Sequence, residues 1–439
     1  MPALPVMIAR SSVQFTSHRL WRISGRPKAA LPFVALWTIL ASSLLAASSA
    51  DWPQFLGPER NGSYTGPPLA RAWAKEGPAV RWKREVGAGF AGLAVKDGRA
   101  ILFHRLGDRA VVECLEAGTG KELWKAGHPT DYRDDFGFDE GPRAPPPIAD
   151  GRVFTFGAEG RLSCWKLENG EPVWSVDAAK VFGAGKGFFG RACSPLVESN
   201  LVVMNLGGRD DAGIVAFEAG SGKVRWKATK DEASYSSPVA ATIQGRKIFL
   251  ALTREALVAL QPADGRVFFR HPWRPAMSAS VSAAVPLVVD DQIFLSASYG
   301  AGASLLRFKE TGPENIWADD ETLSNHYATS VQHQGFLYGW HGRQEQGCEL
   351  RCVEWKTGKV RWKESGLKAG TVTLAGDELL VLTERGELIR LPASPEGFKP
   401  TARAQVLPSE VRAAPAIANG LMFARSRKQL VCLDLARAQ

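Results

Sequence analysis

Beyond residue 50, the chain consists of short stretches in which apolar and polar residues alternate, separated by turns rich in Gly, Asp, Asn and Thr. Alternation with a period of two is typical of β-strands that bury one face. One unit recurs, in which a small or apolar residue is followed by a glycine turn and, ten residues after its first position, by Trp or Phe. Clear copies are CLEAGTGKELW (114–124), CWKLENGEPVW (164–174), AFEAGSGKVRW (216–226) and CVEWKTGKVRW (352–362), and weaker copies lie at 259–269 and 307–317.

Each copy predicts a β-hairpin, because a tight hairpin places a turn residue at positive φ, where glycine avoids a Cβ clash. Two more strand-like stretches precede each hairpin, as in SPLVESNLVVMNL before the copy at 216. The unit is therefore four strands. Its aromatic landmarks recur every 42 to 52 residues, the length of one propeller blade, at Trp82, Trp124, Trp174, Trp226, Phe269, Trp317 and Trp362.

The two ends of the repeat region complement each other. A degenerate unit occupies 371–398, and the tail APAIANGLMFARSRKQLVCLDL then supplies three strands without the outer one. The stretch AVRWKREV around Trp82 is an outer strand without its three partners. Pairing these ends completes an eighth blade and removes the open edges. The sequence thus predicts an all-β, eight-bladed propeller of four-stranded blades over residues 80–436.

Residues 1–50 differ from the rest because they are basic, contain no acid and include the apolar run LPFVALWTILASSLLAA. This pattern predicts a signal peptide, with Ser48 and Ala50 at the positions favoured for cleavage and with 51–79 as an N-terminal extension. An uncleaved anchor, the chain's one expected membrane contact, is the alternative. Without the five basic residues of this segment, the net charge falls from +9 to +4. Interleaved charges without a basic run predict no nucleic-acid binding.

The hairpin repeat resembles the PQQ-like, quinoprotein-type eight-bladed propellers, a group that includes the periplasmic lipoprotein of the outer-membrane barrel-assembly machinery. The stretches DWPQFLGPERNG, GPRAPPP, ASYSSPV, HYATSV and LTERGEL further resemble exported bacterial PQQ-like repeat proteins. The resemblance covers about residues 51–436. It implies the fold and an exported, periplasmic or envelope-associated location, whereas the function depends on the individual site.

For the dehydrogenases of this group, the resemblance implies PQQ beside two adjacent cysteines, a Trp floor, Ca²⁺ held by acidic and amide side chains, and an Asp base. This chain departs from that pattern, because no two cysteines are adjacent and no CxxCH haem signature occurs. Cys114, Cys164, Cys352 and Cys432 share one repeat position, so we expect buried thiols in separate blades rather than disulfides.

Long connections are predicted on only one face, opposite the hairpin turns. A rigid scaffold that is elaborated on one face usually binds something there. The inserted loops are 126–145, 177–192, 207–213, 298–304, 319–327 and 341–347.

The stretch DYRDDFGFDEGPR, residues 131–143, offers three interpretations. It could be a Ca²⁺ site on Asp134, Asp135 and Asp139, although the spacing matches no calcium-loop template. It could hold an acid and base pair. We favour a structural or partner-binding loop in which arginines pair with carboxylates and aromatic residues pack on the rim. The candidates facing a ligand or partner are Tyr132, Arg133, Asp134, Asp135, Phe136, Asp139, Arg143, Phe188, Arg191, Trp273, Trp340 and His341.

The sequence therefore predicts an exported, monomeric propeller that acts as a non-catalytic binding or assembly scaffold through its loop-rich face. We expect a protein or glycan partner there and no catalytic residues. One alternative is a PQQ- and Ca²⁺-dependent dehydrogenase with an atypical site on the same face. A second alternative is a polysaccharide-binding accessory protein, for which exposed tryptophans would stack on sugar rings.

Overall fold

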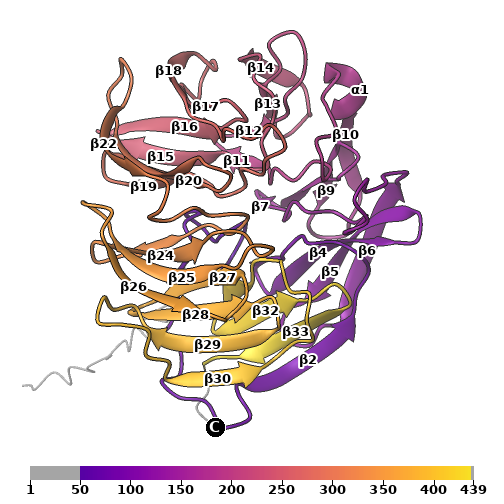
Figure 1. Ribbon diagram of the computed structural model, residues 1–439. Helices are drawn as coiled ribbons and strands as arrows, with labels where there is room; N and C mark the ends of the chain where they lie inside the picture. Colours follow the sequence, from indigo (N-terminus) through magenta and orange to yellow (C-terminus); the bar gives the residue numbers. More distant parts are fainter. Residues whose placement is uncertain (1–49, 437–439) are drawn as a thin grey trace, which may run out of the picture. The chain divides into compact units, whose positions relative to one another are not determined.

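The computed structural model describes residues 50–436, so the predicted signal segment lies outside the described residues except for Ala50. Eight sheets follow one another in chain order, as Figure 1 shows, and all are antiparallel except where the short strand β1 (Ser63–Tyr64) joins one of them in parallel. The only helix of residues 50–436 is α1 (Ala178–Phe182), within the inserted loop 177–192. No helix of these residues is long and apolar enough to cross a membrane.

Four complete blades occupy the first half of the ring. Blade 1 contains β3 (Ala94–Lys96), β4 (Arg99–Leu106), β5 (Arg109–Glu116) and β6 (Glu122–Pro129). Blade 2 contains β7 (Ile148–Ala149), β8 (Arg152–Phe156), β9 (Arg161–Lys166) and β10 (Pro172–Asp177). Blade 3 contains β11 (Leu196–Glu198), β12 (Leu201–Asn205), β13 (Ile214–Glu218) and β14 (Val224–Ala228). Blade 4 contains β15 (Val239–Ile243), β16 (Arg246–Leu252), β17 (Ala256–Leu260) and β18 (Val267–Pro272).

The second half adds two similar blades and two that involve the N-terminal region. Blade 5 contains β19 (Leu287–Val289), β20 (Gln292–Ala297), β21 (Gly302–Arg307) and β22 (Glu314–Asp319). Blade 6 contains β23 (Val331–His333), β24 (Phe336–His341), β25 (Glu349–Glu354) and β26 (Val360–Ser365). Blade 7 contains β27 (Gly370–Ala375), β28 (Glu378–Thr383), β29 (Glu387–Pro392), β30 (Ala402–Gln405) and the added strand β1 (Ser63–Tyr64). Blade 8 contains β31 (Ala416–Ala418), β32 (Leu421–Arg425), β33 (Gln429–Asp434) and β2 (Ala79–Glu85).

The predicted ring closure is confirmed. Strand β2 pairs antiparallel with β33, with Trp82 opposite Cys432, and Figure 1 shows the indigo strand β2 beside the yellow strand β33. Arg81 adds an ion pair of 2.7 Å to Asp434. Blade 8 is therefore held together by residues more than 300 positions apart in the chain.

The aromatic landmarks join each blade to the next. In six blades the indole Nε1–H of the landmark donates to a backbone carbonyl in or beside the hairpin turn of the following blade, at 2.8 or 2.9 Å. In five of these blades, all except the one that carries Trp362, the glycine of that turn has positive φ and lies against the indole, so a Cβ at Gly170 would stand 2.5 Å from the ring of Trp124. These tryptophans are Trp82, Trp124, Trp174, Trp226, Trp317 and Trp362.

The small residues of the repeat lie opposite these aromatic rings. Cys114, Cys164 and Cys352 face Trp124, Trp174 and Trp362 across the ladder, and Cys432 faces Trp82. All four thiols are fully buried and free, as predicted. A small side chain is needed there because the bulky indole occupies the neighbouring position on the same face of the sheet.

Part of the N-terminal extension lies on the axis of the ring. Trp52 exchanges two backbone hydrogen bonds of 2.8 Å with Val95 of blade 1, and the carbonyl of Pro53 accepts from Ile148 of blade 2. Strand β1 then runs parallel to β27 of blade 7, with Ser63 opposite Leu374. We call residues 50–64 the axial segment, because it bonds to the innermost strands of several blades.

Arg60 is the main polar anchor of the axial segment. Its side chain is 2 % exposed and donates to the carbonyls of Ser194, Pro195 and Pro238 in blades 3 and 4. Burial lowers the pKa of Arg60 to about 10, so the guanidinium is still charged at neutral pH. Three carbonyl dipoles thus replace the water that the cation loses.

Candidate functional site

A cavity of about 220 Å³ opens near the axis. Its wall is mainly aromatic and apolar, and the tip of the axial segment contributes Phe55 and Leu56. All the inserted loops predicted from sequence except 207–213 supply side chains to it. These side chains are Phe138, Arg143, Phe189, Ala192, Tyr299, His326, Tyr327, Gln344 and Glu345.

Two guanidinium groups are held in the cavity wall by aromatic rings. Arg143 lies 5.4 Å from the ring centre of Tyr132 and 5.9 Å from that of Phe90. Arg412 lies 5.5 Å from Phe90 and 5.6 Å from Phe138. Such stacking orients arginine without neutralising its charge. Phe90 is therefore in contact with both cations.

These arginines have different polar partners. Arg143 donates to the carbonyls of Gly141 and Asp139, both at 2.7 Å, so both of its terminal nitrogens are engaged by the backbone. Arg412 directs Nε to Glu384 Oε1 at 3.1 Å. Within residues 50–436, no hydrogen bond occupies the two terminal nitrogens of Arg412, whose side chain is 29 % exposed.

The hydroxyl and imidazole groups of the wall are bonded to one another. Tyr299 Oη lies 2.8 Å from His326 Nε2, and Gln344 Oε1 lies 2.5 Å from His326 Nδ1. Tyr327 donates to Glu384 at 3.0 Å. Burial lowers the pKa of His326 and raises that of Tyr327. Both groups are therefore neutral near pH 7, and the charge of the wall comes from the arginines and Glu345.

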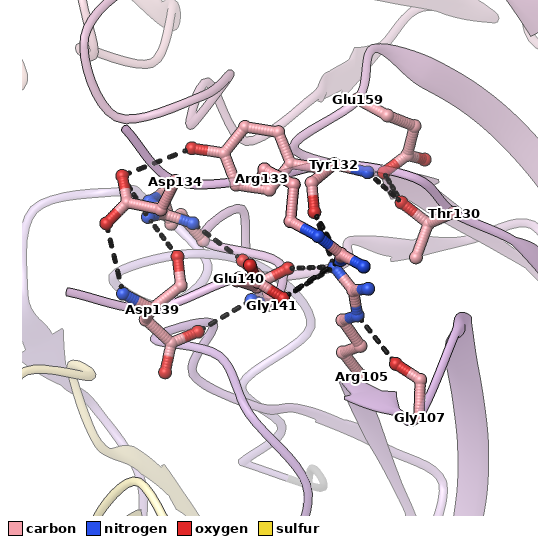
Figure 2. Close-up of polar contacts among 11 residues, drawn as sticks. Arg105, Gly107, Thr130, Tyr132, Arg133, Asp134, Asp139, Glu140, Gly141 and Glu159 are labelled. Atoms are coloured by element: carbon pink, nitrogen blue, oxygen red, sulfur yellow. Dashed lines mark hydrogen bonds and ion pairs between the residues drawn. The ribbon is translucent and has the colours of Figure 1, made fainter. Parts of the chain in front are cut away.

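The acidic loop 131–143 is held by its own carboxylates, as Figure 2 shows. Asp134 accepts hydrogen bonds from the backbone amides of Phe138 at 2.5 Å and Asp139 at 3.2 Å. Asp139 accepts from the amide of Gly141 at 2.6 Å and lies 3.3 Å from Arg427 Nε. These bonds stabilise the turn, since each carboxylate replaces backbone partners that the irregular loop lacks.

The carboxylates do not converge on one point. Asp135 pairs with Lys186 at 2.7 Å, and the exposed Arg133 pairs with Glu140 at 3.0 Å. In the described part of the chain, no group of three or more His, Cys, Asp and Glu side chains could hold a metal ion. The contacts thus favour the structural interpretation of Asp134, Asp135 and Asp139 over the Ca²⁺ interpretation.

Four phenylalanines cluster at the edge of the cavity in a surface that we call the aromatic rim: Phe136, Phe138, Phe188 and Phe189. Phe138 and Phe189 also line the cavity. The ring centres of Phe136 and Phe189 are 5.1 Å apart, and those of Phe138 and Phe189 are 5.8 Å apart. Tyr235 fixes the second loop, because its hydroxyl accepts from the amides of Phe188 and Phe189. Even so, Phe136 is 56 % exposed and Phe138 is 45 % exposed.

Of the twelve residues predicted to face a ligand or partner, only Arg143 lines the cavity. Arg191 instead donates to the carbonyls of Glu159 and Ala184, which ties down the loop 177–192. His341, at the end of β24, accepts from the amide of Ser324. Trp340 lies within β24 and is 3 % exposed in the core around blades 6 and 7. Trp273 packs partly buried against the core around blades 4 and 5.

Sequence reasoning missed several residues that do line the cavity. Phe55 belongs to the predicted N-terminal extension, and Phe90 and Arg412 lie in connections without an insertion. Thr371 begins the innermost strand of blade 7. The tip of DWPQFLGPERNG carries two adjacent apolar residues, the one local signal that this segment is buried.

The cavity does not fit the quinone site that the fold group implies. Within residues 50–436, no cysteine and no tryptophan lines it, and Glu345 is its only carboxylate. These residues therefore offer neither the floor nor the Ca²⁺ ligands of a PQQ site.

The comparisons with known proteins agree with this architecture. A family model described as outer membrane protein assembly factor BamB matches residues 108–364, more than half of the chain. No curated protein matches. BamB from Moraxella catarrhalis is 16 % identical with a TM-score of 0.58, and the match covers 81 % of this chain and 99 % of that one.

Quinohemoprotein alcohol dehydrogenase from Comamonas testosteroni is 13 % identical with a TM-score of 0.63, covering 89 % of this chain and 81 % of that one. The computationally designed Ika8 protein is 11 % identical with a TM-score of 0.56, covering 80 % and 98 %. At these identities the structural likeness shows the fold alone, which a designed protein and an enzyme share. The family match over more than half of its length shows that the chain belongs to the β-propeller family described as outer membrane protein assembly factor BamB.

Proposed function

We propose that this protein is a non-catalytic scaffold of the cell envelope that binds a protein partner on its loop-rich face. The observation that carries the proposal is the aromatic rim, where Phe136 and Phe138 remain about half exposed although the loops around them are tightly bonded. Membership of the BamB family supports the envelope location.

A protein partner fits the chemistry of the rim. Clustered aromatic side chains flanked by cations are typical anchors of protein interfaces, because they bury large apolar areas at low entropic cost. Arg254 lies 5.4 Å from the ring of Phe188, and Lys186 lies 5.4 Å from that of Tyr132. A sugar platform is less well supported, because no tryptophan of the described residues belongs to the rim or the cavity wall.

The experiment compares two double variants of the chain from Asp51 onward, each immobilised and exposed to envelope extract of the producing cells. Phe136→Ser with Phe138→Ser removes the exposed part of the rim. Val173→Ser with Val224→Ser is the matched control, because these valines are exposed on outer strands away from the rim.

We expect proteins that are retained by the unmodified chain and by the valine control to be lost from the rim variant. Equal retention by the rim variant would contradict the proposal, provided that thermal unfolding shows both variants folded. Exposed positions make folding defects small, within about 0.5 kcal/mol for surface substitutions.

A further inference from the structure

We infer that the axial cavity is a binding site for a carboxylate attached to a single aromatic or similarly sized apolar group. This goes beyond the scaffold function, because the cavity lies beside the aromatic rim and can be tested without any protein partner. The inference rests on two observations: the unoccupied terminal donors of Arg412 and the mainly aromatic and apolar wall of the cavity.

The anion-binding element is Arg412. Its guanidinium is fixed by Phe90 and Phe138 on its faces and by Glu384 at Nε, so its orientation is set in advance. The terminal nitrogens are the part of arginine that forms paired hydrogen bonds with a carboxylate. Glu384 also accepts from Tyr327, so its charge is shared between two donors and leaves Arg412 incompletely neutralised.

Thr371 contributes to the same wall near the start of β27 and is 8 % exposed. Its Oγ1, which has no hydrogen-bond partner within residues 50–436, is itself buried and is not reached from the cavity. The hydrogen bonds to the carboxylate are therefore assigned to Arg412 alone.

The rest of the cavity wall determines which apolar group the ligand can carry. Phe55, Phe189 and Tyr235 present aromatic surface, and most of the lining is apolar. A cavity of about 150 Å³ holds one benzene ring. The volume here is about 220 Å³, and the difference is about the size of a carboxylate group. A ligand with one ring and one short acidic arm fits within this volume. The axial segment closes the inner end through Phe55 and Leu56.

The same chemistry has two sources, a free small acid or the carboxyl end of a peptide that finishes in an aromatic residue. The probes are 4-fluorophenylacetate for the first source and N-acetyl-glycyl-4-fluorophenylalanine for the second. Each is paired with its neutral amide. Binding to the chain from Asp51 onward is followed by fluorine NMR titration at pH 7.

We expect at least one acid to bind about tenfold or more tightly than its amide, since a hydrogen bond to a charged group contributes more than one to a neutral group. Binding of the free acid identifies a small carboxylate as the ligand. Binding of the peptide acid alone identifies the carboxyl end of a polypeptide. If neither acid binds, or if acids and amides bind equally, the inference is wrong.

Variants locate the site. Arg412→Gln should weaken the binding of the acid about tenfold and leave the binding of the amide unchanged. Thr371→Val keeps the shape of the wall and removes a hydroxyl that the cavity does not reach, so it should leave both affinities unchanged. Arg427→Gln is the matched control, because Arg427 lines neighbouring cavities but not this one. An acid affinity that is insensitive to Arg412→Gln in a folded variant would overturn the assignment. A failed rim experiment leaves this result unaffected.

Discussion

The two faces of this propeller are built from the same blade unit but are subject to different constraints. On the turn face, the hairpin turn of one blade supplies the carbonyl that accepts the indole N–H of the blade before it. Its glycine must also lie flat against that indole. An insertion there would separate two blades. On the loop-rich face, the loops bond mainly to one another, as Asp134 and Tyr235 show.

This difference explains why the inserted loops lie on only one face of the propeller. A longer connection on the loop-rich face costs only the entropy of closing a longer loop, which grows slowly with length. A longer hairpin turn would lose a buried hydrogen bond and the packing of a tryptophan. Residues that bind partners therefore accumulate in the loops of the loop-rich face, because the stability of the propeller does not depend on those loops.

The largest expected effect comes from breaking the scaffold at its closure. Truncation after Arg427 removes β33, unpairs β2 and leaves blade 8 with two strands. We expect loss of the cooperative thermal transition, because the ring opens and the cores on both sides of blade 8 are exposed. Circular dichroism with temperature measures this. An unchanged Tm would show that closure does not hold the fold.

The axial segment should matter almost as much. Arg60→Met leaves the carbonyls of Ser194, Pro195 and Pro238 without their donor, which we expect to cost about 3 kcal/mol of the free energy of unfolding. Arg71→Ala, an exposed residue of the same extension, is the control. Denaturant unfolding measures both. Equal stability of the two variants would mean that the axial segment does not contribute to the stability of the fold through Arg60.

The closure also predicts a pH dependence through Glu113. Burial alone would raise the pKa of Glu113, but hydrogen bonds from His104 and Lys125 and the charge of Arg84 on β2 lower it to about 2. Because the folded pKa is depressed, its stabilisation is present above the unfolded pKa and is lost as the pH falls toward 2.

A shift of this size corresponds to about 3 kcal/mol, lost between about pH 4.5 and pH 2. Stability measured against pH should therefore fall less steeply in Glu113→Gln than in the unmodified chain. Parallel curves would show that Glu113 titrates normally.

The smallest expected effect compares the two faces directly. Trp124→Phe keeps a ring but removes the donor to the carbonyl of Leu167, so we expect a loss of about 1–2 kcal/mol. Phe136→Ser on the rim should change stability by less than about 0.5 kcal/mol. Denaturant midpoints of the two variants test the contrast. A rim substitution that costs more than Trp124→Phe would assign the rim to the scaffold.

The architecture could be predicted because it is repeated. The step from Cys114 to Trp124 recurs in other blades, and the missing outer strand after Asp434 matches the unpaired strand around Trp82. The cavity could not be predicted in the same way, since Phe55, Thr371 and Arg412 come together only when the ring closes. Local pattern also predicted that Trp340 faces a ligand or partner, whereas this side chain is buried within β24.

The most direct test of the central claim, that function resides on the loop-rich face, is photo-cross-linking in the producing cells. A photoreactive phenylalanine replaces Phe136 on the aromatic rim in one strain and Ser221 in a hairpin turn in another, both exposed positions. The account predicts a discrete cross-linked protein from position 136 and none from position 221. A discrete adduct from position 221 with none from position 136 would contradict it.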